Sequence, residues 1–198
     1  MESFNKLDNN PVLKKELREL LELCQSSILS VPDDMNLTFD TPLKLHGRYT
    51  LSEVLSGLGY HSLENQPAMR EGALHLRNIN ASAFFVTLNK SEKHYSPTTL
   101  YEDYAINEKL FHWQSQSTVS DKSPTGQRYI HHKENDHSIL IFVREDRKNK
   151  NGLAEPYYFL GSVSYVSHKG SRPISFVWEL EFPMPAHLVR ETAHLLTA

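Results

Sequence analysis

The chain has 198 residues, a net charge of −3, 39% hydrophobic and 23% charged side chains, a composition typical of soluble globular domains. Its one cysteine, Cys24, excludes an internal disulfide and a zinc site built from several cysteines. No apolar run approaches the roughly 20 residues that span a bilayer and no signal peptide is evident, so we expect a cytoplasmic protein without a membrane partner.

The first predicted element is an amphipathic helix. Asn10 suits the N-cap, Pro11 suits the first helical position, and an apolar stripe follows. The stripe consists of Leu13, Leu17, Leu20, Leu21 and Cys24. Turn-forming residues between 30 and 42 indicate a linker. We therefore divide the chain into a helical lead-in with its linker, residues 1–40, and a second domain, residues 41–198.

A second helix is predicted from Thr50, because Thr50 and Glu53 form a capping box and Gly59 can end the helix. Beyond residue 71 the apolar period becomes that of strands. Strands are expected at 83–88, 127–131, 138–144, 157–168 and 174–182, with a hairpin tip at 145–156, a short helix at 101–110 and a final helix from 185. Short strands with few helices predict an α+β fold, with a small curled sheet or β-barrel flanked by helices.

The sequence contains none of the common catalytic signatures. It lacks the nucleophile elbow, the phosphate-binding loop, the Rossmann fingerprint and the zinc-protease motif. Cys24 lies on a leucine-rich face, which favours packing over nucleophilic chemistry. His131, His132 and His137 are close in sequence, but neighbouring strand residues face opposite sides, so a shared metal is not expected. We expect no catalytic centre, metal or cofactor.

Residues 89–128 combine aromatic and polar side chains in a long connection, which is typical of binding segments. Ring faces suit stacking on a flat heteroaromatic ligand, and amide, hydroxyl or carboxylate groups suit its polar edge. Inward packing of Phe111 and Trp113 is the alternative for those two rings. The candidate base-binding residues are Tyr95, Tyr101, Asp103, Trp113, Gln114 and Ser115.

The charge is unevenly distributed along the chain. Residues 1–40 hold 4 basic and 8 acidic side chains, whereas residues 122–172 hold 9 basic and 5 acidic ones. A basic rim suffices for a DNA-binding protein, because phosphate contacts give affinity that does not depend on sequence. A solvated hairpin tip explains the run from Arg144 to Lys150 equally well. The candidate DNA-backbone residues are Lys90, Lys93, Arg128, Lys169 and Arg172.

Three runs carry a resemblance to a known family: FFVTLNKSEKHYSPTTLYEDYAINEKLFHWQSQS, SPTGQRYIHH and FLGSVSYVSHKGSRPISFVWEL. Over roughly residues 42–185 the chain resembles a bacterial domain found at the C-terminus of proteins that combine a phospholipase-D-type nuclease with a superfamily II helicase. Relatives of this kind look like ATP-dependent, modification-dependent (type IV) restriction enzymes. Their C-terminal domain is similar to SRA (SET-and-RING-associated) and PUA-like folds.

The resemblance implies that this domain recognises 5-methylcytosine or 5-hydroxymethylcytosine in double-stranded DNA by flipping the base into a pocket. It also implies that the partners are the helicase and nuclease domains of a parent chain. The sequence has no nuclease or helicase motif, so the domain itself is expected to be non-catalytic. Two alternatives are kept: a coupling domain between helicase and nuclease without base readout, and a small hydrolase or nuclease.

Overall fold

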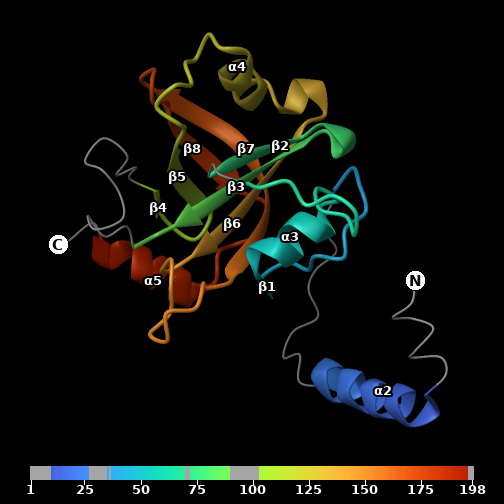
Figure 1. Cartoon of the computed structure of the whole chain (residues 1–198). Coiled ribbons are helices and arrows are strands. Elements are labelled where there is room, and N and C mark those ends of the chain that lie inside the picture. The colour runs from blue at the N-terminus through green and yellow to red at the C-terminus, as the bar shows by residue number, and fades with distance from the viewer. Residues whose placement is uncertain (1–9, 27–34, 36, 70–71, 90–102, 196–198) are drawn as a thin grey trace. The chain divides into compact units, whose positions relative to one another are not determined.

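The computed structural model describes residues 10–26, 35, 37–69, 72–89 and 103–195 (Figure 1). The chain divides into two compact units, residues 1–33 and residues 34–198. Among the described helices, none combines the length and apolar character needed to cross a bilayer. The side chains of residues 22–26, including the predicted packing residue Cys24, lie outside the description.

The first unit contains α2 (Pro11–Ser26). The N-cap prediction is confirmed, since Asn10 Oδ1 accepts a hydrogen bond from the Leu13 backbone N–H at 3.1 Å. The apolar stripe is exposed to solvent, with 45% of Leu13 and 60% of Leu21 accessible. The leucines of the predicted stripe whose side chains are described, Leu13, Leu17, Leu20 and Leu21, are all exposed.

In the second unit, α3 (Leu51–Gly57) begins with the predicted capping box. Thr50 Oγ1 accepts the Glu53 N–H, and Glu53 Oε2 accepts the Thr50 N–H at 2.7 Å. Gly59, just beyond the helix, has a φ of +68°, which a glycine adopts without strain. Local chemistry thus sets where this helix begins and ends, and the burial of Val54 and Leu55 packs it on the fold.

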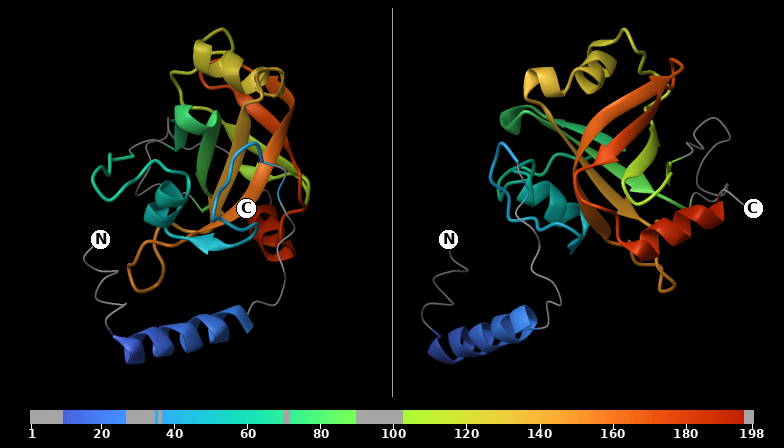
Figure 2. Two further views of the ribbon diagram at one scale, coloured as in Figure 1. Left: turned by 90° about the vertical axis from the view of Figure 1, so that its right-hand side faces the viewer. Right: turned by 180° about the vertical axis from the view of Figure 1, so that it is seen from behind.

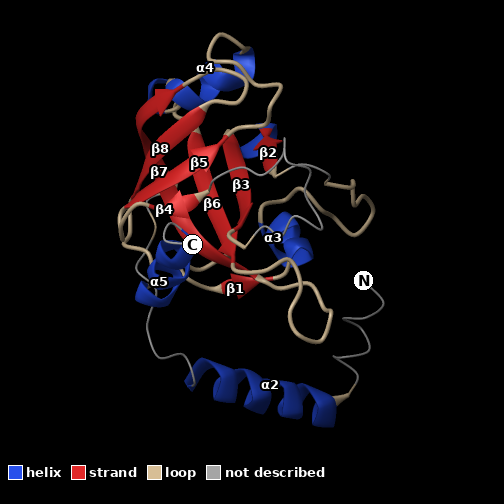
Figure 3. Ribbon diagram, turned by 90° about the vertical axis from the view of Figure 1, so that its left-hand side faces the viewer, coloured by secondary structure: helices blue, strands red, loops and turns tan. Residues whose placement is uncertain are grey.

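One open sheet of eight strands makes up most of the second unit (Figure 3). Its strand order is β2-β3-β6-β7-β8-β5-β4, and β1 pairs with β7. The pair β3–β6 is parallel and the other pairs are antiparallel. The strands are β1 (Arg48–Tyr49), β2 (Ala73–Leu76), β3 (Ala81–Thr87), β4 (Tyr104–Ala105), β5 (Leu110–Gln114), β6 (Ser138–Arg144), β7 (Tyr157–Lys169) and β8 (Ser175–Leu180).

The two faces of the sheet cover separate apolar cores. The larger core joins residues from β3, β5, β6 and β8, and Phe84 of β3 stacks on Trp113 of β5 with ring centroids 3.9 Å apart. Three strands, β6, β7 and β8, lie between these two in the sheet order, so the sheet bends until β3 and β5 face each other. The smaller core lies under α3 and includes Val54 and Phe142.

Two further helices close the ends of this fold (Figure 2). α4 (Pro124–Ile130) lies at one end of the sheet, and α5 (Ala186–Leu195) lies at the opposite end. Short 3₁₀ turns, η1 (Arg77–Ile79) and η2 (Lys133–Asn135), precede β3 and β6. The α+β expectation is confirmed.

Two predicted elements are wrong in type. The strand expected at 127–131 is part of α4, because Ser123 caps the helix through the Gly126 N–H and Pro124 occupies its first turn. The helix expected at 101–110 is, in its described part, β4 and the turn to β5. In that turn Asn107 Oδ1 accepts the backbone N–H groups of Lys109 and Leu110, a local bond that competes with a helix.

Candidate functional site

One end of the sheet collects the segments that carry the predicted site residues. The last residue of β5, Gln114, pairs with the first residue of β8, Ser175. Ser175 also pairs with Lys169, the last residue of β7, so the β7–β8 turn lies at the same end of the sheet. The parallel strands β3 and β6 start at this end, and α4 lies over it (Figure 1). The loops and helix at this end therefore form the candidate site.

Three of the predicted base-binding residues lie together here, and we call them the Asp103 cluster: Asp103, Gln114 and Ser115. Asp103 is 8% exposed, and its Oδ1 accepts the backbone N–H of Gln114 at 2.8 Å. Gln114 Nε2 donates to Ser175 Oγ at 3.2 Å, and Ser115 Oγ accepts the N–H of Ile174 at 2.9 Å. These bonds fix a carboxylate, an amide and a hydroxyl at the junction of three strands.

Trp113 is not available for stacking on a base. It is 4% exposed, and its ring lies parallel to Phe84, with an interplanar angle of 6°, and near Phe176. Alternation along β5 turns Trp113 and Phe111 inward and Gln114 the other way. We therefore correct the prediction for Trp113 and assign it to the core, which is the alternative that the sequence left open.

Four predicted residues, Tyr95, Tyr101, Lys90 and Lys93, lie outside the described residues. Of the other backbone candidates, Lys169 and Arg172 are exposed in the β7–β8 turn.

That turn is tied to the loop before α4. Arg172 N donates to Val119 O at 3.2 Å, and Ser171 Oγ donates to Asp121 Oδ1 at 2.9 Å. The latter bond holds the pKa of Asp121 below its usual value. The basic turn is thus anchored next to the Asp103 cluster, where Ile174 bonds to Ser115.

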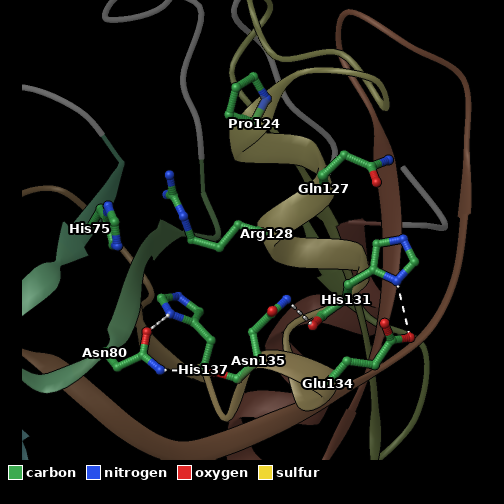
Figure 4. A pocket seen from close by; sticks show the side chains of 9 residues that line it. All are labelled: His75, Asn80, Pro124, Gln127, Arg128, His131, Glu134, Asn135 and His137. Atoms are coloured by element: carbon green, nitrogen blue, oxygen red, sulfur yellow. Dashed lines mark hydrogen bonds and ion pairs between the residues drawn. The ribbon is translucent and has the colours of Figure 1, made fainter.

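Arg128, the last described backbone candidate, lines a groove on the other side of α4 (Figure 4). The groove has a volume of about 590 Å³, and most of the residues that line it have polar side chains. The lining residues come from β2, α4 and the turns around η1 and η2: His75, Asn80, Pro124, Gln127, Arg128, His131, Glu134, Asn135 and His137.

A hydrogen-bond network fixes the floor of the groove. Asn80 Nδ2 donates to the carbonyl oxygens of Asn135 and Asp136, so its Oδ1 must accept, and it accepts from His137 Nδ1 at 2.9 Å. His137 Nε2 is then the acceptor for Ser82 Oγ, 2.9 Å away. The bond to Asn80 Oδ1 places a proton on His137 Nδ1, and Ser82 can donate to Nε2 when the ring is neutral.

The same logic assigns His132, which lies behind the groove. The Tyr165 backbone N–H donates to His132 Nε2 at 3.1 Å, so His132 Nδ1 carries the proton and donates to His137 O. Burial lowers the pKa of His132 below its usual value. Its ring also meets the edge of Trp178, which is fully buried in the core.

Electrostatics agree with neutral imidazoles. Burial, with added repulsion from His75 and Arg128, lowers the pKa of His137 to about 4. Burial also lowers the pKa of His75, with Arg128 and Arg77 adding to the effect. The groove wall around Arg128 therefore carries one cation beside two uncharged rings at neutral pH.

Ser82, His137 and Asn80 have the order of a nucleophile, a base and an orienting group. Ser82 is 0% exposed and is the second residue of β3, a strand whose residues are all buried. A nucleophile must reach its substrate, so we interpret the trio as a structural network. Among the described residues, no group of three or more metal-ligating side chains lies close enough to hold an ion.

The sequence predicted only Arg128 among the groove residues. His131 and His132 were considered as a strand pair, whereas they follow a helix: His131 lines the groove and pairs with Glu134 at 3.1 Å, and His132 is buried. Asn80 and His137 are 57 residues apart. The sequence offers only a weak signal for this site, namely that both side chains carry several polar atoms. The pairing of β3 with β6 is what brings Asn80 and His137 together.

A family model described as a domain of unknown function (DUF3427) matches residues 43–192, which is most of the chain and nearly all of its second unit. No curated protein matches the chain.

Proposed function

Because the chain belongs to the DUF3427 family, we propose from the site that its second unit recognises 5-methylcytosine or 5-hydroxymethylcytosine in double-stranded DNA. We propose further that it is the non-catalytic specificity domain of a type IV restriction helicase–nuclease, with an SRA/PUA-like bend of the sheet enclosing the flipped base. The observation that carries the proposal is the Asp103 cluster beside a basic turn.

The chemistry of the Asp103 cluster matches the polar edge of cytosine. A carboxylate accepts a hydrogen bond from the exocyclic amine of cytosine, and the bond from the Gln114 N–H holds the Asp103 carboxylate in one orientation, which supports this role. The amide of Gln114, which is partly exposed, suits a further base atom. Ser115 is fully buried, and its hydroxyl accepts the Ile174 N–H and donates to Gln116 O, so we correct its prediction as a base contact and assign it a positioning role. With Trp113 in the core, the stacking role passes to Tyr95 and Tyr101, which border the cluster in sequence.

The energetics set the size of the expected preference. Extruding a base costs a few kcal/mol, which stacking and edge hydrogen bonds offset. A buried methyl group contributes about 0.8 kcal/mol, so modified DNA is expected to bind about fourfold more tightly than unmodified DNA. Phosphate contacts from Lys169 and Arg172 add affinity without changing this ratio.

The test is a fluorescence-anisotropy titration of the full chain with two duplexes that differ only in one 5-methylcytosine. We expect tighter binding of the modified duplex. Asp103→Asn should weaken binding of both duplexes, because the amine that the carboxylate would accept from is present in cytosine and in 5-methylcytosine. Asp146→Asn is the matched control, because Asp146 is exposed on the hairpin between β6 and β7 and loses the same charge. Equal affinity of the unsubstituted chain for both duplexes refutes the proposal.

The exposed face of α2 favours a second role. Leu13, Leu17 and Leu21 are between 38% and 60% accessible, and an apolar helical face gains stability by packing on a partner. We propose that it contacts the helicase or nuclease part of a parent chain. Leu17→Lys should weaken that contact in a pull-down of the parent's separate modules without changing the DNA preference; unchanged capture contradicts this role.

A further inference from the structure

The groove of Figure 4 holds a cation that the fold itself does not neutralise. Arg128 is half-buried, and within the described part of the chain its guanidinium has neither a carboxylate partner nor a hydrogen bond. An unpaired guanidinium that has lost part of its hydration is costly. A ligand with oxygen acceptors would relieve this cost.

The surroundings of Arg128 select an anion. His75 lies close enough to feel the guanidinium charge, and Arg77 adds a further positive charge near the same ring. The one carboxylate in the lining, Glu134, is engaged by His131. The half of the groove around Arg128 and His75 is thus positive, and its walls are held by the Asn80–His137 network.

The position of the groove connects it with the base site. Gly126 of α4 packs against the loop before the helix, where an added Cβ would lie 2.1 Å from Ser120 O, and against Ile174, whose N–H bonds to Ser115. Arg128 is two residues further along the same helix and faces the groove. One short helix therefore separates the Asp103 cluster from the groove.

We propose that this groove is a phosphate-binding site that takes a phosphodiester of the DNA backbone. The Arg128 fork donates to the non-bridging oxygens, and His75 supplies a further N–H. The planar guanidinium matches two phosphate oxygens at once, and the open, polar shape of the groove suits a passing strand. The choice of DNA as the source of the phosphate rests on the proposed function; the anion site itself does not.

The test measures binding of the full chain to an unmodified duplex as a function of salt. Arg128→Gln should weaken binding about tenfold and reduce the slope of log affinity against log salt by about 1. Arg128→Lys keeps the charge but not the fork, so it should keep the slope and lose part of the affinity. Arg147→Gln, an exposed arginine on the hairpin at the far end of the sheet, is the matched control and should bind like the unsubstituted chain.

A second arm identifies the source of the phosphate. The imidazole signals of His75 are followed by NMR during titration with inorganic phosphate at constant ionic strength, and with the duplex. Shifts with both ligands, lost in Arg128→Gln, support the proposal. Shifts with inorganic phosphate alone overturn the assignment to DNA, and unchanged affinity and signals in Arg128→Gln overturn the site.

The outcomes separate this inference from the proposed function. A chain that binds both duplexes equally, yet loses affinity for both on Arg128→Gln, retains the phosphate site and refutes base recognition. A chain that prefers the modified duplex and is indifferent to Arg128→Gln retains base recognition and refutes the phosphate site. Circular dichroism of each variant confirms that it is folded before binding is compared.

Discussion

Acidification should destabilise the second unit through His137. Its pKa in the folded chain is about 4, because burial and the neighbouring His75 and Arg128 disfavour the charged ring. In the unfolded chain an imidazole has a pKa near 6.5. Between these two values the unfolded state binds a proton that the folded state does not, so the free energy of unfolding falls as the pH falls.

The magnitude follows from the two pKa values. Each pKa unit corresponds to about 1.4 kcal/mol, so the loss reaches about 3 kcal/mol once the pH is below both values. Within the window the slope is about 1.4 kcal/mol per pH unit for this one group. Domains of this size are stable by roughly 5–15 kcal/mol, so the effect should be easily measured.

The assay is urea unfolding between pH 7 and 4.5, followed by the fluorescence of Trp113 and Trp178, which are both buried in the second unit. The comparison is with His137→Gln, which can still bond to Ser82 but cannot titrate. Glu53 and Asp121, whose pKa values are lowered, lose stabilisation in acid in both proteins. The difference between the two curves therefore isolates His137.

We expect the unsubstituted chain to lose stability more steeply than His137→Gln as the pH falls below 6.5. Parallel curves would show that His137 is not held neutral, and the reasoning from its burial would be refuted. The assignment of its tautomer through Asn80 and Ser82 would then fail with it.

Three further substitutions test the packing and the local signals. Trp113→Ala should lower the free energy of urea unfolding by about 3–5 kcal/mol, as for a core aromatic; a loss below about 1 kcal/mol would mean that the ring does not pack on Phe84 as described. Gly126→Ala should lower the melting temperature in calorimetry, because its Cβ would approach Ser120 O to 2.1 Å and overpacking costs about 1–3 kcal/mol; an unchanged melting temperature contradicts this. Thr50→Ala should cost about 1 kcal/mol in urea unfolding by removing the cap of α3, and no loss would show that the capping box is not needed.

The elements that depend on residues close together in the sequence were predicted well. The Asn10 cap of α2, the Thr50–Glu53 capping box and the apolar runs of β3, β6, β7 and β8 each depend on a few adjacent side chains. Residues 127–131 were misassigned because a segment of five residues has no clear period. The cap at Ser123, which settles its structure, lies outside that segment.

The site residues also differ in whether the local sequence or the tertiary structure decides their role. Alternation along β5 required that Trp113 and Gln114 point in opposite directions, but only the bending of the sheet decided which of them meets Phe84. Asp103 and Gln114 were predicted separately as base-binding residues of one segment, and the β4–β5 pairing places them in contact.

By itself the sequence determined the caps of α2 and α3, the strands β3, β6, β7 and β8, and that residues 89–128 combine polar and aromatic side chains, because each of these follows from near neighbours in the chain. The tertiary structure alone decided that Trp113 is core and that Arg128 faces a groove floored by Asn80 and His137. Those facts depend on the parallel pairing of β3 with β6, which joins residues more than fifty positions apart. The periodicity of apolar residues within one segment gives no information about such a contact.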